Sequence, residues 1–166
     1  MKIIICIFSL EELQICSNNY SIVSLNHDFI HPRLKRLYIS KNHFTEWKSI
    51  CHLGRLFPRL ETLIASENPL ESFRSHDDDD VNQCLPNLHT LSVDQVQISQ
   101  WMDIIALTKL PSLHALRIYS APLLKVCSDF LNETIIDEKI SFLGLRKRRT
   151  ILSTIGLHEE FKKIKW

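Results

Sequence analysis

Glycine is scarce in this chain, with only 3 residues among 166. The scarcity argues against a glycine-rich loop that cradles phosphate and against long flexible linkers. The net charge of +1 gives no overall attraction to nucleic acid or to a membrane surface. No hydrophobic run approaches the roughly 20 residues that are needed to cross a bilayer. Apolar residues make up 45% of the chain and charged residues 23%, so we expect one globular domain of ordinary size.

The chain also lacks a paired cysteine motif. Its five cysteines are odd in number and no two form a C-x-x-C pair, which disfavours a disulfide framework. Reduced thiols in a cytoplasmic protein are the simpler interpretation. Residues 1–8 resemble the start of a signal peptide, but two glutamates follow quickly and no small-residue cleavage site precedes them. A secreted or receptor-type protein is therefore kept as an alternative.

A catalytic constellation is absent from the sequence as well. The eight histidines show no H-E-x-x-H spacing, and no serine stands in a G-x-S-x-G element. His76 precedes the run Asp77–Asp80, but four adjacent carboxylates repel each other and lack the alternating spacing of a calcium loop. We expect a protein without catalytic residues, metal or cofactor.

What the chain does contain is a repeat of leucines with a period of 24 to 28 residues. This period and pattern are typical of leucine-rich repeats, in which each repeat gives one short strand to a parallel sheet. We therefore predict an α/β leucine-rich repeat solenoid, with strands on the concave face and helical or irregular returns on the convex face. The copies are Leu10-x-x-Leu13-x-Ile15-x-x-Asn18-x-Tyr20, Leu34-x-x-Leu37-x-Ile39-x-x-Asn42-x-Phe44, Leu60-x-x-Leu63-x-Ala65-x-x-Asn68-x-Leu70, Leu88-x-x-Leu91-x-Val93 and Leu113-x-x-Leu116-x-Ile118.

Within one repeat, the alternation at Leu37 and Ile39 predicts a strand with one buried face. Arg36 and Tyr38 must then point outward. The asparagine that follows predicts a tight turn, because its side chain can bond backbone groups and it tolerates unusual backbone angles. The last two repeats have Val96 and Ala121 at that position, so we expect their turns to close differently.

The returning segments show a helical pattern. Trp47, Ile50 and Leu53 are spaced three residues apart, as on one face of a helix. Thr45 is the expected N-cap, and Ser99 and Trp101 repeat the arrangement in the fourth copy. Both tryptophans are predicted to be core residues. A proline stands two residues before the first leucine in four repeats, where it ends the preceding return: Pro32, Pro58, Pro86 and Pro111.

The leucine phase is lost after Leu124. We therefore expect a repeat array over residues 1–124 and a capping or divergent segment over residues 125–166. Eight basic residues occur from Lys139 onward, and residues 142–155 mix apolar and basic positions as an amphipathic capping helix would. Solenoids need polar-faced caps at their ends, which favours this interpretation over an electrostatic contact with an acidic surface.

Several distinctive phrases stand in order along the chain. They are Leu10-Glu11-Glu12-Leu13 with Asn19-Tyr20, Leu37-x-Ile39-x-x-Asn42-x-x-x-x-Trp47, Leu53-Gly54 with Phe57-Pro58-x-Leu60, Leu85-Pro86-Asn87-Leu88, Trp101-x-Asp103-Ile104 and Pro122-Leu123-Leu124. The tryptophan-bearing returns are more distinctive than the leucines. In this order, the phrases resemble the repeat region of tubulin-folding cofactor E and its cofactor E-like relatives, and the resemblance covers about two-thirds of the chain. No ubiquitin-like domain, which the relatives carry after the repeats, is found in residues 125–166.

The resemblance implies a non-enzymatic module that recognises α-tubulin and acts in tubulin folding or microtubule turnover. It also implies a cytoplasmic, cytoskeleton-associated protein, which we expect to be a monomer. A general repeat scaffold for another cytoplasmic or nuclear protein is the alternative within the same fold. The partner-binding residues are predicted on the concave face, where outward strand and turn positions are Arg36, Tyr38, Ser40, Lys41, Thr62, Ile64, Glu67, Ser92, Asp94, Arg117 and Tyr119.

Overall fold

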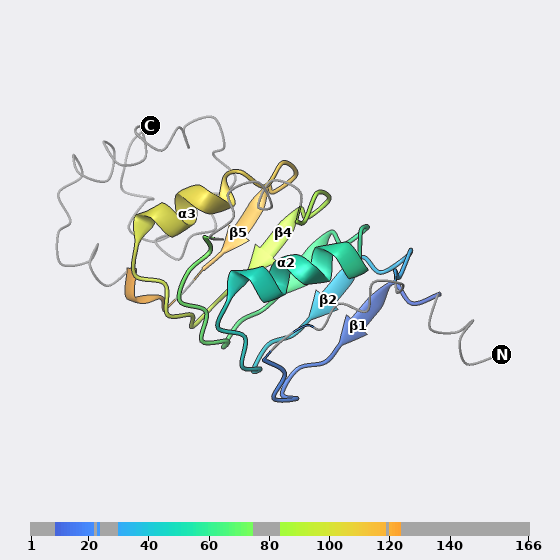
Figure 1. Cartoon of the computed structure of the whole chain (residues 1–166), viewed down its shortest axis with the longest axis horizontal. Coiled ribbons are helices and arrows are strands. Elements are labelled where there is room, and N and C mark those ends of the chain that lie inside the picture. The colour runs from blue at the N-terminus through green and yellow to red at the C-terminus, as the bar shows by residue number, and fades with distance from the viewer. Residues whose placement is uncertain (1–8, 22, 24–29, 75–83, 119, 124–166) are drawn as a thin grey trace.

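The structure is a computed structural model, and it describes residues 9–21, 23, 30–74, 84–118 and 120–123. The five strands form one sheet in the order β1-β2-β3-β4-β5, and each neighbouring pair is parallel. The two helices lie on the same side of this sheet (Figure 1). The elements follow along the chain as β1 (Glu12–Gln14), β2 (Arg36–Tyr38), α2 (Trp47–Leu56), β3 (Thr62–Ile64), β4 (Thr90–Ser92), α3 (Trp101–Leu107) and β5 (Ala115–Arg117).

One leucine position runs across the middle of the sheet. The central residues of neighbouring strands are direct partners, and from β2 to β5 their leucines are completely buried. Each repeat therefore supplies one strand in phase with the next, and the predicted leucine-rich repeat fold is confirmed. These partners are Leu13, Leu37, Leu63, Leu91 and Leu116.

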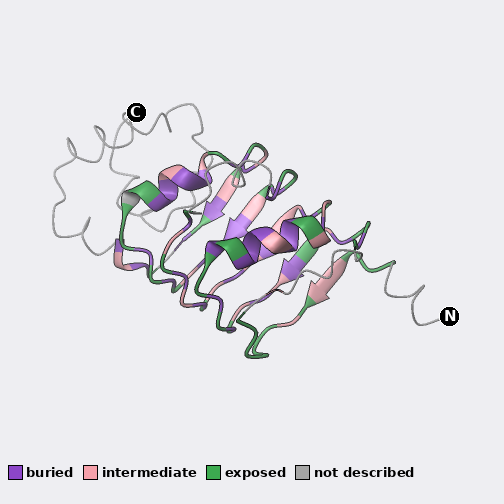
Figure 2. Ribbon diagram, viewed as in Figure 1, coloured by how far each residue is buried: buried purple, intermediate pink, exposed green. Residues whose placement is uncertain are grey.

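The core lies between the sheet and the returning segments, because alternate strand residues point to opposite faces. Figure 2 shows buried residues along the strands and along one stripe of α2. Trp47 of α2 is buried and packs edge-on against Phe73, with 5.2 Å between ring centroids. The prediction that Trp47 is a core residue is confirmed, whereas the side chain of Trp101 lies outside the described part of the structure.

Each strand leads into a turn in which the residue directly before the asparagine position of the repeat has a left-handed backbone. The last two repeats keep this backbone although Val96 and Ala121 replace asparagine, so the prediction that their turns close differently is wrong for the backbone. The residues at this position are Ser17, Lys41, Glu67, Gln95 and Ser120, with φ between 53° and 58°. Asn19 in the first repeat is left-handed as well, with φ 58°.

The turn asparagines bond the backbone of two repeats at once, as their sequence position predicts. Asn68 Nδ2 donates to the carbonyl oxygens of Ala65 in its own repeat and Ile39 in the preceding one, both at 3.0 Å. Its Oδ1 accepts from the N–H of Phe44 at 3.2 Å. Asn42 links the second repeat to the first in the same way. Replacing asparagine by valine or alanine removes these bonds but leaves the turn conformation intact.

The predicted N-cap at Thr45 is wrong. Helix α2 begins one residue later, and its N-cap is Glu46, an extended residue without a side-chain capping bond. Gln100 takes the same role before α3. A contact between repeats explains the shift, because Glu46 forms a short parallel bridge with Ser72 of the next repeat. That pairing keeps Glu46 extended and starts the helix after it.

A buried carboxylate joins the return of the third repeat to α3. Asp103 is 1% exposed, and its Oδ1 accepts from Ser72 Oγ at 2.5 Å, from the Phe73 N–H at 3.2 Å and from Arg74 Nε at 3.2 Å. Arg74 Nη2 also donates to Gln100 at 2.9 Å. The buried carboxylate is therefore held by an exposed cation and by two further donors, which compensate for its loss of water.

The first repeat is the exposed end of the described array. Its Leu10 is 40% exposed, whereas Leu34 at the same repeat position is 1% exposed. Tyr20 and Phe44 show the same contrast, with 46% and 2%. The asparagine of this repeat, Asn18, donates within its own turn. No described repeat covers β1 on its outer side, so the consensus core residues of this repeat remain partly open.

Some sequence predictions concern residues outside the described ranges. These are the signal-like segment 1–8, the acidic run 77–80 and the capping segment 125–166, so the expected division at residue 124 stays a prediction. Among the described residues, no helix has the length and apolar character that a bilayer span requires.

Candidate protein-binding surface on the open face of the sheet

The face of the sheet opposite the helices, called here the open face, presents two rows of outward side chains. The strand register places the members of each row side by side, one per repeat. Adjacent strands lie about 4.8 Å apart, so each row is spaced at that interval. The first row is Glu12, Arg36, Thr62, Thr90 and Ala115, and the second is Gln14, Tyr38, Ile64, Ser92 and Arg117.

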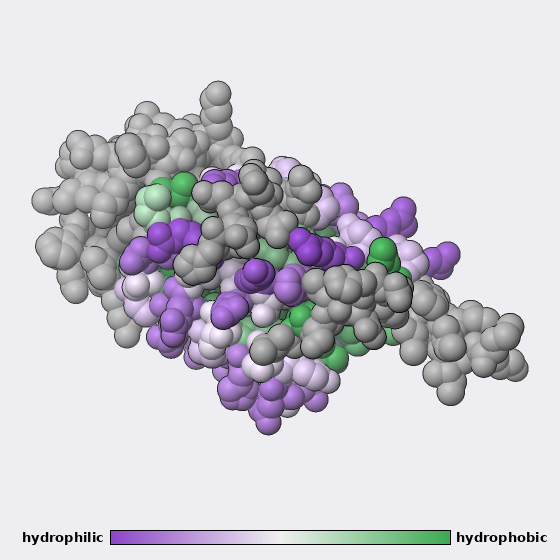
Figure 3. Space-filling view, viewed as in Figure 1, coloured by the Kyte–Doolittle hydropathy of each residue, from purple (hydrophilic) through white to green (hydrophobic). Residues whose placement is uncertain are grey.

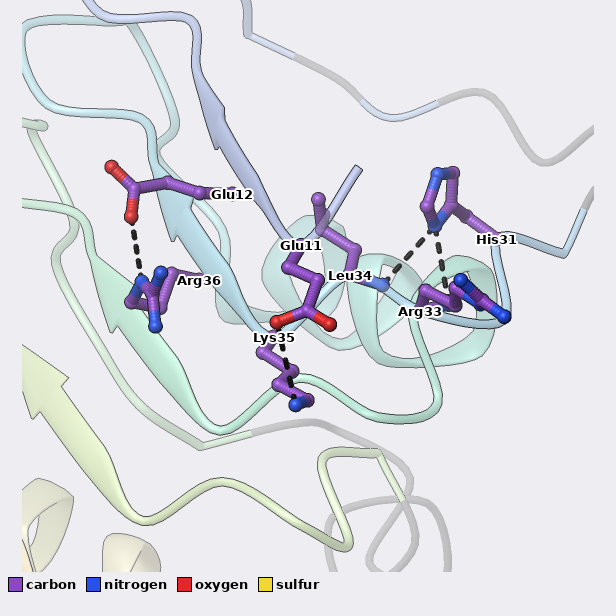
Figure 4. A network of polar contacts seen from close by, with 7 residues as sticks. All are labelled: Glu11, Glu12, His31, Arg33, Leu34, Lys35 and Arg36. Atoms are coloured by element: carbon purple, nitrogen blue, oxygen red, sulfur yellow. Dashed lines mark hydrogen bonds and ion pairs between the residues drawn. The ribbon is translucent and has the colours of Figure 1, made fainter. Parts of the chain in front are cut away.

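Ion pairs cross the first two strands. Arg36 Nε donates to Glu12 at 2.6 Å, and Lys35 Nζ lies 3.4 Å from Glu11 (Figure 4). The hydrogen bond from Arg36 lowers the pKa of the Glu12 carboxyl, and the same bond raises the pKa of Arg36. The guanidinium of Arg36 is therefore exposed but already has an ionic partner within the sheet.

A third ion pair joins two turns beside the strands. Lys41 and Glu67 are the left-handed residues of consecutive repeats, and Lys41 Nζ lies 3.6 Å from Glu67. Because both side chains are exposed, water and salt screen the attraction strongly. The two charges nevertheless neutralise each other at this edge of the surface.

Hydroxyl and carboxylate groups on β4 and the neighbouring turn are also engaged. Ser66 Oγ lies 3.4 Å from Ser92 Oγ and accepts from the Asp94 N–H at 3.1 Å. Asp94 in turn accepts from the N–H of Gln95 at 2.9 Å. Ser92 is only 9% exposed, so its prediction as an outward contact residue does not match its burial. Its small side chain lies at the bottom of the face, between larger neighbours.

The other predicted contact residues present side chains for which the structure gives no partner among the described residues. Tyr38, Ser40, Thr62 and Ile64 are half-buried, and Arg117 is exposed on β5. Tyr119 lies outside the described residues. The surface thus divides into groups that are satisfied within the sheet and groups that remain open to a partner.

Comparisons with individual proteins identify relatives of this chain, although no model of a known protein family matches it. The chain is 36% identical over 116 residues to the tubulin-specific chaperone cofactor E-like protein of Homo sapiens, covering 70% of this chain and 27% of that protein. It is 38% identical over 120 residues to human tubulin-specific chaperone E, covering 70% of this chain and 22% of that protein. The repeat region of this chain belongs to the tubulin-specific chaperone E and cofactor E-like family.

The match extends further in another relative of this family. The tubulin-specific chaperone E of Mus musculus is 35% identical over 145 residues, which cover 86% of this chain. The chain spans about a quarter of the length of these curated relatives. The identity to these relatives confirms the resemblance seen in the sequence.

Sequence reasoning missed five residues of the open face and its turns, which are Glu12, Gln14, Ser66, Thr90 and Ala115. Glu12 and Gln14 occupy the same repeat positions as Arg36 and Tyr38, so the phase of the first repeat could have identified them. Thr90 follows from the phase of the fourth repeat in the same way. Ser66 occupies the same repeat position as Ser40 and Asp94, so repeat phase could have identified it too, and the structure adds its contacts with β4 and the following turn.

A buried histidine also escaped notice, although it shapes the edge next to the paired residues. His31 Nδ1 accepts from the N–H groups of Leu34 at 3.1 Å and Arg33 at 3.4 Å (Figure 4). The ring packs edge-on against Phe57, with 6.2 Å between centroids. His31 thereby organises the turn that leads into β2. This turn sets the backbone position from which Lys35 and Arg36 extend.

The described surface presents side chains that a partner protein could contact, but it does not present a cluster of metal-binding side chains. Among the described residues, no three His, Cys, Asp or Glu side chains come together as a metal site. In the view of Figure 3, the described part of the surface is mostly hydrophilic, and hydrophobic residues appear in small separate places. That view faces the side of the sheet that carries the helices, so the open face lies behind it.

Proposed function

We propose that this chain is a non-enzymatic module that binds tubulin on the open face of its sheet and acts in tubulin folding or microtubule turnover. The observation that carries the proposal is the 35–38% identity to proteins named as tubulin-specific chaperones. We further propose that α-tubulin is the subunit contacted, that the module acts as a monomer without a cofactor, and that it works in the cytoplasm beside the cytoskeleton.

The physical support comes from the rigidity of the open face. Parallel strands in register hold one outward side chain per repeat at fixed spacing. The backbone that carries them is bonded from repeat to repeat by Asn42 and Asn68. A preorganised surface of this kind loses little conformational freedom on binding, which favours recognition of a folded protein.

A direct binding measurement with purified tubulin heterodimer tests the proposal. The full chain is titrated against labelled heterodimer, and saturable binding is expected. Tyr38→Ala removes an aromatic side chain from the open face and is expected to weaken binding about tenfold, as truncating an interface aromatic does. Met102→Ala is the matched control, because Met102 is a large apolar residue exposed on α3, on the opposite side. This control is expected to bind as the wild type does.

Other outcomes identify the alternatives. If the chain captures a different protein from cell extract and shows no affinity for heterodimer, a general repeat scaffold replaces the tubulin module. If the protein isolated from cells carries a cleaved N-terminus or attached glycans, the secreted or receptor-type alternative applies. If Met102→Ala weakens binding as much as Tyr38→Ala does, the open face is not the binding surface.

A further inference from the structure

We infer that Arg117 supplies the charged contact of the open face and that Tyr38 and Ile64 supply its apolar anchor, whereas Arg36 contributes little to binding. The inference rests on the proposed binding of tubulin and defines the chemistry of the surface that the face fits. It follows from which side chains already have partners within the sheet.

Arg36 is the most conspicuous cation on the face, but it is already occupied. Its guanidinium donates to Glu12 at 2.6 Å, and Glu12 also accepts from Gln14 Nε2 at 3.2 Å. A partner carboxylate would have to displace Glu12 to reach Arg36, so it would exchange one ion pair for another. Lys41 is likewise paired, with Glu67 at 3.6 Å. Little net affinity is expected from either cation.

Arg117 differs from both of these cations. It lies at the other end of the face, on β5, and its side chain is exposed. The structure shows no acidic side chain within ion-pair distance of Arg117 among the described residues. An incoming carboxylate therefore gains a bidentate, charge-assisted contact there without displacing any partner among the described residues.

The apolar anchor lies two and three strands away from this cation. Tyr38 and Ile64 are register partners on β2 and β3, so their side chains stand next to each other on the face. Both residues are half-buried, so part of each side chain remains accessible on the face. An aromatic ring beside an aliphatic side chain is the kind of rigid contact that supplies binding energy at low entropic cost.

The sheet fixes the distance between these two features. Ile64 and Arg117 occupy the same row two strands apart, which corresponds to about 10 Å, and Tyr38 is one strand further, at about 14 Å. Ser92 lies between Ile64 and Arg117 in this row. Its side chain is small and buried, so the surface is recessed at that position. The partner that fits is a protein surface with an apolar side chain over Tyr38 and Ile64 and a carboxylate about 10 Å towards β5.

The experiment compares single variants of the full chain in the same heterodimer titration, at low and high salt. Arg117→Ala is expected to weaken binding about tenfold and to reduce its salt dependence, because an unscreened ionic contact is lost. Ile64→Ser is expected to weaken binding by a similar factor with an unchanged salt dependence. Arg36→Ala and Glu12→Ala are expected to stay within about twofold of the wild type. Circular dichroism confirms that each variant remains folded.

The outcomes separate this inference from the proposed function. If the wild type does not bind heterodimer, the proposed function fails, and the inference fails with it. If the wild type binds but Arg117→Ala binds equally well, only the inference fails. It also fails if Arg36→Ala weakens binding as much as Arg117→Ala does. Arg117→Lys keeps the positive charge but loses the paired donors of the guanidinium. An affinity between those of the wild type and Arg117→Ala supports an ionic contact with bidentate geometry.

Discussion

Replacing Gly54 by alanine is expected to destabilise the protein, although alanine is the better helix former. Gly54 lies inside α2, where exposed glycine costs about 1 kcal/mol relative to alanine. The return of the third repeat passes directly beside it, however. An added Cβ would overlap the carbonyl oxygen of Cys84, lie 2.7 Å from the carbonyl carbon and lie 3.0 Å from Leu85 Cδ2. The absence of a side chain at Gly54 therefore allows α2 to pack against the next repeat.

The magnitude follows from what must move. Overpacking a core costs about 1–3 kcal/mol, and the upper end applies here because the obstacle is a backbone carbonyl rather than a flexible side chain. Subtracting the helix propensity gained by alanine leaves a loss of about 2 kcal/mol in the free energy of unfolding. For a domain of this size, that loss corresponds to a decrease of about 4–8 °C in the melting temperature.

Urea unfolding followed by circular dichroism measures the change, with a thermal melt as a second assay. Lys48→Ala serves as the control, because Lys48 is an exposed residue in the same helix. This control is expected to stay within about 0.5 kcal/mol of the wild type. If Gly54→Ala is as stable as the wild type or more stable, α2 does not pack against the Cys84 carbonyl, and the proposed reason for this glycine is wrong.

Three further predictions test the first repeat, the asparagine bonds and the paired charges. Phe44→Ala is expected to lower the free energy of unfolding by about 3–5 kcal/mol, because the Phe44 side chain is only 2% exposed. Tyr20→Ala, at the same repeat position, is expected to lower it by less than about 1 kcal/mol, because Tyr20 is 46% exposed. Equal losses in urea unfolding would contradict this difference. Asn68→Ala is expected to cost about 2–4 kcal/mol in the same assay, because it removes the partner of the Phe44 N–H and of the Ala65 carbonyl, whereas the Ile39 carbonyl keeps its bond from Asn42; a neutral effect would show that water replaces the amide. The Arg36 hydrogen bond lowers the pKa of Glu12 in the folded state, so this contribution to stability is present above the unfolded pKa and is lost as the pH falls through the folded pKa. Between about pH 7 and pH 3, the urea midpoint is therefore expected to fall less for Glu12→Gln than for the wild type, and an equal or larger fall in the variant would refute the pairing.

The sequence predicts the sheet well because its rule is local and repeated. Leucines at a constant offset from a turn place Leu37, Leu63 and Leu91 in register without knowledge of any other contact. The turn asparagines are predictable for a similar reason, since their function is to bond nearby backbone. Position in the repeat is enough to assign both roles.

Features that depend on contact between repeats could not be read from the sequence in this way. Thr45 is a better N-cap than Glu46 by intrinsic preference, but the bridge between Glu46 and Ser72 overrides that preference. Likewise, no motif indicates that Arg36 is held by Glu12 while Arg117 has no described partner. That difference arises from the side chain that each neighbouring strand happens to offer at the facing position.

Different chemistry joins the two halves of the array, and this affects the open face. Amide-to-backbone bonds from Asn42 and Asn68 tie the first three repeats together on the side of the turns. Where asparagine is absent, Asp103 ties the return of the third repeat to α3 from behind the sheet. The Asp103 contacts join the segment that follows β3 to the helix that precedes β5, and these two strands carry Ile64 and Arg117. A change at Asp103 therefore alters the spacing that a partner must match, although Asp103 lies on the opposite side of the core from the proposed contact.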